Sequence, residues 1–393
     1  MVKSKRKLLS ELVLPVFLPS LVFSAGENVL LPMIPAGAEL LGADLAAASL
    51  VAGMIMVGTL IADLPAAKFV ARIGERKGMI IASLLAAIGL AIAGLATNLW
   101  VMGFGVLIVG MCASTFALAR HTYMAGAVPY EVRARASSTL GGMFRGGGLI
   151  GPFIAAFLIA LGDFKFIYWG ATALCIVAAV ILLFAKTDEV ADSANQTSHS
   201  TWHITKREWD KLSTLGLASA ILAVVRTARI VGLPLWALYL HIDAATTSLL
   251  IGGAAALDVA LFYTSGQVMD KWGRRAAAVP TLALMGATMF LLPLTHDAVG
   301  LLWVALAMSL ANGLGSGLIM TIGADLAPAD ARGEFLAAFR FLVDASVAIT
   351  APVLAVASAT IGLGYGFSFF GVISIYGALL MWKHIPTHIK HVK

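Results

Sequence analysis

The sequence predicts an all-α membrane protein whose twelve transmembrane helices form two pseudo-symmetric six-helix bundles. Hydrophobic residues occupy 60% of the 393 positions and charged residues only 12%, whereas soluble domains contain about 25% charged residues. The apolar residues form long runs, and a helix needs about 20 such residues to cross the hydrocarbon core of a bilayer. Short motifs also recur between the two halves of the chain at one fixed spacing.

Twelve apolar runs of the required length alternate with short polar stretches. A longer polar stretch in the middle lacks an apolar period and is expected to be a linker. The predicted domains are therefore residues 1–186, a cytoplasmic linker at residues 187–212, and residues 213–393. The predicted spans are residues 12–37, 46–69, 78–97, 99–122, 137–161 and 166–186 in the first half, and 213–240, 247–269, 276–294, 298–324, 334–360 and 363–382 in the second.

The placement of Lys and Arg predicts the orientation, because loops on the cytoplasmic side keep the positive charge. Alternate connections are basic, and the intervening ones are acidic, with Lys165 as their one basic residue. Both termini and the linker are therefore predicted to be cytoplasmic, in a cell (inner or plasma) membrane. The basic N-terminal run is expected to precede a true span, because the apolar run after it is too long for a signal peptide. The basic connections hold Arg72, Arg76 and Lys77; Arg133 and Arg135; Lys206, Arg207 and Lys211; Lys271, Arg274 and Arg275; and Arg332.

Several function classes are disfavoured by what the sequence contains. The net charge is +6, and the Lys and Arg residues responsible for it lie mainly between spans. Nucleic-acid binding instead needs basic residues clustered on one face of a module. The two cysteines, Cys112 and Cys175, stand alone within apolar runs, which is neither a disulfide framework nor a metal-ligand spacing. No nucleophile elbow, phosphate loop or histidine cluster occurs at a membrane face. We therefore expect no enzyme activity, metal, cofactor or nucleic-acid partner, and an ion channel is disfavoured as well.

An internal repeat relates the two halves of the chain. Two motif pairs share one offset of 199 residues, and a third pair follows after a small gap. The pairs are Pro129 with Arg133 against Pro328 with Arg332, Arg72-Ile-Gly74 against Lys271-Trp-Gly273, and Leu31-Pro32 against Leu233-Pro234. Two repeated six-helix halves joined by a linker are typical of secondary transporters, which hold their substrate between the repeats near the bilayer midplane.

The loop after the eighth predicted span carries the motif Gly266-Gln-Val-Met-Asp270-Lys271-Trp-Gly273-Arg274-Arg275. Its glycines permit close helix approach and a tight turn, and its carboxylate can accept from the basic cluster. The motif resembles the GxxxDxxGRR signature of the major facilitator superfamily. The resemblance implies the major facilitator fold and a role for Asp270 as a conformational latch of the outward-facing state. The first-half copy departs from the pattern, because Ala67 and Ala71 replace the glycine and the aspartate.

The fifth predicted span is rich in glycine and contains a Gly-Pro pair. It contains Gly146, Gly147, Gly148, Gly151 and Pro152, and it is similar to the glycine-rich "antiporter" motif of drug:proton exporters. This resemblance implies a gating role. Small residues at helical spacing also serve close packing, so packing alone is an equally weighted alternative.

The first predicted span places Glu27 and Asn28 a few residues before Pro32. This arrangement resembles the opening of the twelve-helix drug:proton antiporters, which carry an acid there. The fourth span departs from those antiporters, because Val106 stands where they usually carry an arginine four residues before a glycine, here Gly110.

Ionisable side chains inside spans cost about 2.5 to 3.5 kcal/mol each on insertion scales, so each one is a functional candidate with a partner. Arg145 and Asp258 lie at matching distances from the cytoplasmic loops, as do Asp63 and Arg340. The resemblance to the major facilitator superfamily implies that the spans of each pair touch between the halves, so we expect two ion pairs there. Asp344 lies one helical turn after Arg340 and can share its guanidinium.

Glu27 and Arg229 occupy equivalent positions when the halves are superposed through their prolines. Burial disfavours an ionised carboxylate and a facing cation favours it, which is the balance that a proton-coupled switch requires. Arg226, Asn28 and Trp236 are the further candidates for the cavity. The alternative is a set of permanently ionised pairs that hold helices together, and we favour it for Asp63 with Arg340 and for Arg120. Weaker candidates for the cavity wall are Met33, Phe144, Tyr239, Phe262, Tyr263 and Met320.

These observations predict a secondary active transporter that couples protons to the efflux of small hydrophobic or amphipathic compounds by alternating access. Its expected partners are a small-molecule substrate, protons and membrane lipid, and it is expected to be a monomer. The alternatives are an importer or uniporter of a small nutrient, or a lipid translocator, on the same fold.

Overall fold

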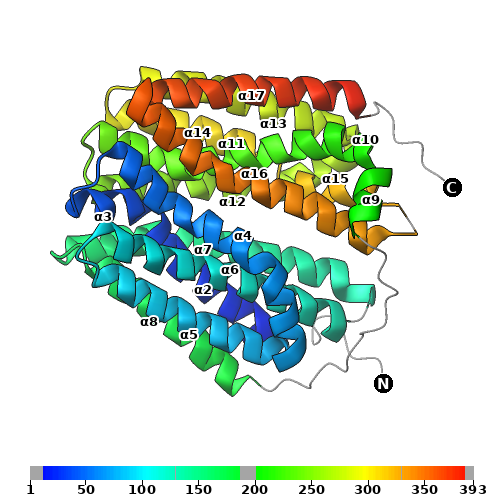
Figure 1. Ribbon diagram of the computed structural model, residues 1–393, viewed down its shortest axis with the longest axis horizontal. Helices are drawn as coiled ribbons and strands as arrows, with labels where there is room; N and C mark the ends of the chain where they lie inside the picture. The colour runs from blue at the N-terminus through cyan, green and yellow to red at the C-terminus, as the bar shows by residue number, and fades with distance from the viewer. Residues whose placement is uncertain (1–11, 129, 186–200, 329, 386–393) are drawn as a thin grey trace. The chain divides into compact units, whose positions relative to one another are not determined.

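The computed structural model describes residues 12–128, 130–185, 201–328 and 330–385 of the chain. Over these ranges the backbone is almost entirely helical and contains no strand (Figure 1). Twelve helical segments of the described chain are long and apolar enough to cross a membrane, as the sequence predicts. The N-terminal tail and residues 187–200 of the predicted linker lie outside the described residues.

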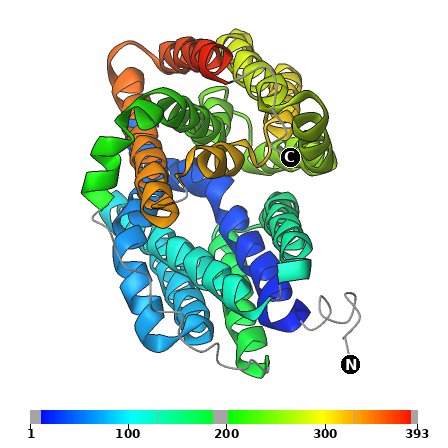
Figure 2. The ribbon, with the colours of Figure 1, turned by 90° about the vertical axis from the view of Figure 1, so that its right-hand side faces the viewer.

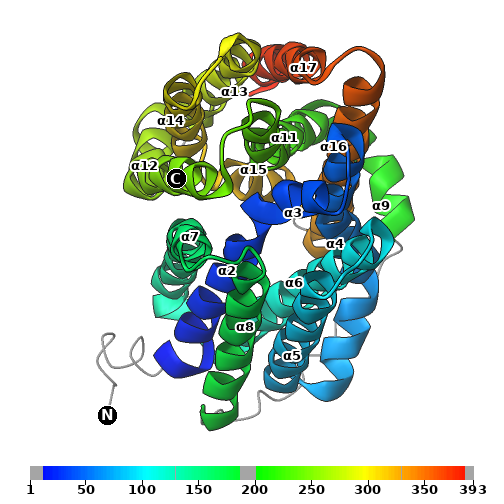
Figure 3. The ribbon, with the colours of Figure 1, turned by 90° about the vertical axis from the view of Figure 1, so that its left-hand side faces the viewer.

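The chain divides into two compact units (Figure 2, Figure 3). Unit 1 comprises Met1–Asn195 and Asp243–Gly252, and unit 2 comprises Gln196–Ile242 and Gly253–Lys393. The first turns of one helix of the second half, α12, are therefore grouped with unit 1.

Unit 1 begins with a span built from four consecutive helical pieces. The π-helix η1 (Val13–Phe17) leads into α2 (Leu18–Leu30), and the 3-10 turn η2 (Leu31–Met33) joins α2 to α3 (Ile34–Leu40). The change of helix type coincides with Pro32, because proline removes a backbone donor and crowds the preceding turn. The other helices are α4 (Leu45–Ile73), α5 (Glu75–Gly94), α6 (Leu99–Ala127), α7 (Tyr130–Ala160) and α8 (Phe166–Phe184).

Unit 2 has the same order of spans, with one break that the sequence analysis did not predict. The tenth span is divided into α14 and α15 by a turn at residues 315–317, where Gly317 has a φ of +76°. Glycine adopts this left-handed region without the steric cost of a side chain. The helices and turns are α9 (Thr201–Arg207), α10 (Trp209–Lys211), η3 (Leu212–Gly216), α11 (Leu217–Tyr239), α12 (Ala244–Trp272), α13 (Arg274–Leu291), η4 (Leu292–Leu294), α14 (Ala298–Leu314), α15 (Leu318–Leu326), α16 (Arg332–Thr360) and α17 (Leu363–His384).

The internal repeat extends to the caps that start the helices. Three helix starts of the first half recur 199 residues later. In two of them, the side chain of the N-cap residue accepts a hydrogen bond from the backbone nitrogen three positions later. In the third, a glycine with positive φ precedes the helix. The pairs are Asp44 and Asp243 before α4 and α12, Asn98 and Asp297 before α6 and α14, and Gly74 and Gly273 before α5 and α13. Such caps satisfy the backbone donors that a helix start leaves unpaired.

Close helix packing in unit 1 depends on small residues. Helix α6 packs against both α4 and α5. A Cβ atom placed on Gly110 of α6 would lie 2.0 Å from the carbonyl oxygen of Ile55 in α4, and one on Gly58 of α4 would lie 2.2 Å from the carbonyl oxygen of Leu107. Membrane helices associate through such backbone contacts, because lipid provides no hydrophobic driving force between them.

We expect Gly110→Ala to destabilise unit 1, because the added methyl group would force α4 and α6 apart at a cost of about 1 to 3 kcal/mol. The matched control is Gly142→Ala on α7, where an added Cβ has no neighbour within 4 Å. Thermal unfolding of the detergent-purified protein should show a lower midpoint for Gly110→Ala and an unchanged or higher midpoint for the control. Equal midpoints would contradict this view of the α4 and α6 contact.

The short helices α9 and α10 are docked on unit 2 by an apolar contact. Ile204 is 2% exposed and belongs to a buried cluster at the start of α16. The other buried members of this cluster are Leu212, Ala220, Ala223, Ala331, Phe335, Phe339 and Val343.

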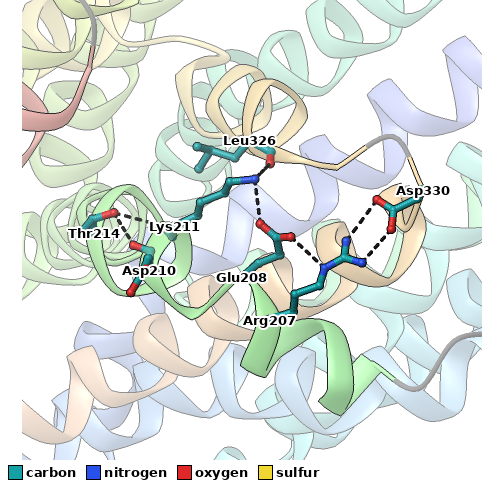
Figure 4. Close-up of polar contacts among 7 residues, drawn as sticks. All are labelled: Arg207, Glu208, Asp210, Lys211, Thr214, Leu326 and Asp330. Carbon is teal, nitrogen blue, oxygen red and sulfur yellow. Dashed lines mark hydrogen bonds and ion pairs between the residues drawn. The ribbon is translucent and has the colours of Figure 1, made fainter.

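Ion pairs reinforce this docking (Figure 4). The guanidinium of Arg207 donates to both carboxylate oxygens of Asp330, at 2.7 and 3.1 Å. Glu208 accepts from Arg207 at 2.9 Å and pairs with Lys211 at 2.7 Å. The hydrogen bond from Lys211, followed by that from Arg207, holds the pKa of Glu208 below its usual range. Lys211 also donates to the carbonyl oxygen of Leu326 at the end of α15.

We expect Glu208→Gln to loosen α9 and α10, because Lys211 and Arg207 lose the carboxylate that joins them. Hydrogen–deuterium exchange over residues 201–212, corrected for intrinsic rates, should become faster in this variant at neutral pH. Since the pKa of Glu208 is lowered in the folded state, its contribution is present above the unfolded pKa and is lost as pH falls through the folded value. The wild type should therefore approach the variant at acidic pH. Asp210→Asn is the matched control, and an equal effect of that substitution would contradict the assignment.

Candidate functional site

The intramembrane charges of unit 1 centre on Glu27 of α2 and Arg120 of α6. Arg120 is 8% exposed, and its guanidinium carbon lies 4.9 Å from the ring centroid of Phe144 on α7. Within the described part of the chain, Arg120 is the charged group that acts electrostatically on the half-buried Glu27.

Asn28, next to Glu27, takes part in the contact between α2 and α7. Its side-chain Nδ2 donates to the carbonyl oxygen of Ser24 at 2.8 Å, and the Ser24 hydroxyl donates to the carbonyl oxygen of Phe144 at 2.9 Å. Ser24 therefore makes the hydrogen bond that links α2 to α7, and Asn28 bonds back to Ser24 within α2.

The glycines of α7 differ in what they contact. A Cβ atom on Gly147 would lie 2.6 Å from that of Ser24, and one on Gly151 would lie 2.7 Å from Asn28. Gly148 has more room, since Asn28 Oδ1 would be 3.8 Å away. Pro152 is buried within the same helix. Gly147 and Gly151 thus allow α7 to approach α2 beside Glu27, which is the packing alternative of the sequence analysis.

Unit 2 contains a second charged cluster, formed by three helices. Arg229 of α11 donates to Asp258 Oδ2 of α12 at 2.8 Å and to Ser309 Oγ of α14 at 2.8 Å. Asn312, also of α14, donates to the other oxygen of Asp258 at 3.0 Å. Asp258 is 8% exposed. Each of its two oxygens therefore accepts one side-chain hydrogen bond, one from a guanidinium and one from an amide.

Arg226 lies one turn before Arg229 and reaches the break in the tenth span. Its guanidinium donates to the carbonyl oxygen of Gly315 at 2.7 Å. Gly315 is the C-cap of α14, where helix carbonyls lack intrahelical donors and carry partial negative charge. The cation and the helix end therefore stabilise each other.

Trp236 is enclosed by side chains of unit 2. Its indole Nε1 donates to Thr295 Oγ1 at 2.8 Å, and its ring stacks on Tyr239 and meets Phe367 edge to face. At 4% exposure, Trp236 is a packing residue of this unit.

Other charged residues that were predicted to pair between the halves have partners within their own units. Asp63 accepts a hydrogen bond from Ser114, and Arg340 Nε lies 3.2 Å from Asp344 Oδ2 one turn along α16. Arg145 is half-buried on α7. The pairs that would join the units, Arg145 with Asp258, Asp63 with Arg340 and Glu27 with Arg229, stay predictions.

The glycine- and arginine-rich motif at the end of α12 fixes the start of α13. Gly273 has a φ of +85° and precedes α13. Arg274 donates to Asp325 of α15 at 3.0 Å, and Arg275 lies over the ring of Trp382 on α17 at 4.0 Å. Gly266 and Lys271 belong to the last turns of α12, with the Lys271 ammonium 5.2 Å from the ring of Trp272. The side chain of Asp270, the predicted latch, lies outside the described residues.

Sequence reasoning missed three contributors to these clusters. It did not assign Arg120 to Glu27, and it did not select Ser309 and Asn312. The last two are three residues apart, so they lie on one face of an apolar helix. That spacing, and the glycines of the Asn312 to Gly317 stretch, are signals that could have identified both the cluster and the helix break.

We expect the Arg229 and Asp258 pair to be strongly coupled, because removing one partner of a buried pair leaves an uncompensated charge at a cost of about 3 to 5 kcal/mol. Arg229→Gln and Asp258→Asn should each lower the free energy of unfolding, measured by SDS titration in mixed micelles, and the double variant should cost less than their sum. The control cycle uses Arg340→Gln and Asp344→Asn, whose side chains are 50% and 25% exposed and should couple by about 0 to 1 kcal/mol. Additive effects at Arg229 and Asp258 would contradict the assignment.

A comparison of the sequence with known proteins identifies a matching family. The sequence model of the Major Facilitator Superfamily matches residues 16–351 and 215–392. A tetracycline resistance protein, class E, of Escherichia coli is 26% identical over 256 residues, covering 62% of this chain and 61% of that protein. Multidrug resistance protein 2 of Bacillus subtilis (strain 168) is 22% identical over 177 residues, covering 45% of this chain and 44% of that protein. The chain thus matches less than two thirds of the length of these relatives.

Solved structures share the fold at low sequence identity. The crystal structure of a D-xylose-proton symporter superposes with a TM-score of 0.74 and 15% identity, covering 96% of this chain and 98% of the symporter. At this identity the likeness is evidence of the fold alone.

Proposed function

Because the chain belongs to the Major Facilitator Superfamily and is a multi-pass membrane transporter rather than an enzyme, we propose that it exports small hydrophobic or amphipathic compounds in exchange for protons. Transporters of this architecture work by alternating access, in which two bundles rock about a site near the midplane. We further propose that the protein is a monomer in the cell (inner or plasma) membrane with both termini in the cytoplasm, as the distribution of Lys and Arg predicts.

The observation that carries the proposal is the different surrounding of the two buried acids. Asp258 has hydrogen bonds to both oxygens from Arg229 and Asn312. Glu27 has a single opposing charge within the described residues, Arg120. A carboxylate held by several donors stays ionised, whereas one balanced between desolvation and a single cation can exchange a proton. Glu27 is therefore the proposed site of proton exchange.

The proposed cycle follows from the neighbours of this acid. Protonation of Glu27 removes its negative charge. Among the described residues, Arg120 then keeps its contact with the ring of Phe144 but loses the charge that acts on it. Asn28, which packs close to Gly151 of α7, follows Glu27 directly in α2. We propose that a change in charge at Glu27 alters this packing of α2 against α7.

The names of the two relatives support export of drug-like compounds, because one is a tetracycline resistance protein and the other a multidrug resistance protein. Uptake is the second candidate, since the D-xylose-proton symporter shares the fold. A lipid translocator on the same fold is the third. One fold hosts many cargos, so the direction and the substrate need a transport assay.

We expect Glu27→Gln to abolish proton-driven accumulation of tetracycline or ethidium in inverted membrane vesicles, because an amide cannot take up or release the proton. Glu39→Gln is the matched control, since Glu39 is an exposed acid at the end of α3 and its loss should leave accumulation unchanged. Undiminished accumulation in the Glu27 variant would remove this acid from the mechanism. Accumulation of neither probe by the wild type, with uptake of a nutrient in right-side-out vesicles, would favour the importer.

A further inference from the structure

The outer face of the docked linker helices carries aromatic and cationic side chains. Trp202 and Trp209 are 68% and 59% exposed, and Lys206 lies between them in sequence and is exposed. Trp202 and Lys206 are four residues apart and so lie on one side of α9, and Trp209 begins α10 directly after the break at Glu208. The opposite side of α9 buries Ile204, and Glu208 reaches its two cations from the break.

Each of three cations at this end of unit 2 lies over a tryptophan ring. The Lys206 ammonium is 5.3 Å from the ring of Trp202. Lys271 with Trp272 and Arg275 with Trp382 repeat the arrangement at 5.2 and 4.0 Å. The end of α12, the start of α13 and the end of α17 all lie at the end of the bundle where α9 and α10 sit (Figure 1). The Trp202 pair therefore lies at the same end of unit 2 as two other tryptophan and cation pairs.

The charge of Lys206 is available to a partner outside the chain. The neighbouring carboxylates are engaged, because Glu208 pairs with Arg207 and Lys211, and Asp330 accepts both hydrogen bonds from Arg207. Asp210 is exposed on the following turn. Among the described residues, the ammonium of Lys206 contacts the face of an aromatic ring rather than an acid.

The position of this face in the chain indicates which kind of partner it binds. Trp209 begins a helical stretch, Trp209–Tyr239, that is long and apolar enough to cross a membrane, so the face lies at one end of a candidate span. Tryptophan rings favour the headgroup level of a bilayer, and lysine extends its ammonium toward the phosphates. Anionic headgroups attract each such cation.

We propose that Trp202, Lys206 and Trp209 form a binding face for the headgroups of anionic phospholipids in the membrane that the protein spans. The lipid fixes the outer side of α9 and α10 while Arg207 and Glu208 fix the inner side. The face thereby anchors the segment that connects the linker to the loop before α16. This inference is independent of the transported substrate and of its coupling to protons.

The test measures binding of phosphatidylglycerol and of phosphatidylcholine to the detergent-purified full chain by native mass spectrometry. We expect preferential binding of phosphatidylglycerol, and a loss of about fivefold in its affinity in Lys206→Gln, because one cation near an anionic surface contributes about 1 kcal/mol. Trp202→Ala should weaken binding as well. In nanodiscs, the wild type should exchange amide hydrogens over residues 201–211 more slowly with phosphatidylglycerol than with phosphatidylcholine alone.

The matched controls are an exposed tryptophan and an exposed lysine elsewhere in the chain. Trp303→Ala removes a tryptophan of the same 68% exposure at the start of α14, and Lys165→Gln removes an exposed cation from the loop before α8. Neither control should change the affinity. Equal affinity of the wild type for both lipids, equal losses in the controls, or exchange over residues 201–211 that does not depend on the lipid would each overturn the proposal.

Discussion

A charge inside the hydrocarbon core must have a partner, and this constraint organises both units. Unit 2 meets it completely at Asp258, which accepts from Arg229 and Asn312 while Ser309 takes a further bond from the same guanidinium. Arg226 instead uses the carbonyl oxygen exposed at a helix break. In unit 1 the guanidinium of Arg120 acts electrostatically on Glu27, and Asp63 accepts a hydrogen bond from Ser114. The two units thus meet the same requirement with different groups.

The repeat supplies the same scaffold around two different clusters. N-caps and positive-φ glycines recur at 199 residues, so both units start their helices by the same local chemistry. The residues between these caps have diverged. Glycines on α6 and α7 permit backbone contacts in unit 1, whereas Gly315 and Gly317 interrupt the tenth span in unit 2. Conserving the caps keeps the helices in place, while changes between them alter the charges that the helices present.

The helices could be predicted from sequence because apolar length and turn chemistry are local properties, and all twelve spans lie where the hydropathy pattern indicates. The partners of the charges could not, because they depend on helix rotation. Depth matching predicted a pair of Asp258 with Arg145 between the units, which stays a prediction, and it gave no sign that Asp258 also bonds Arg229 or that Arg120 acts on Glu27. Depth along a helix can be counted in residues, but the face on which a side chain lies within a bundle is set by tertiary packing. The contacts of Trp236 with Thr295 and Phe367 likewise depend on packing that the sequence pattern does not contain.

The central claim is that the two intramembrane acids have different roles: Asp258 is held in a hydrogen-bonded cluster, and Glu27 is the proposed site of proton exchange. Infrared difference spectroscopy across a pH titration observes this directly, because only a protonated carboxylic acid gives its C=O stretching band. We expect the wild type to show one such band from the membrane interior that disappears in Glu27→Gln and persists in Asp258→Asn. A band that persists in the Glu27 variant and disappears in the Asp258 variant would contradict the account.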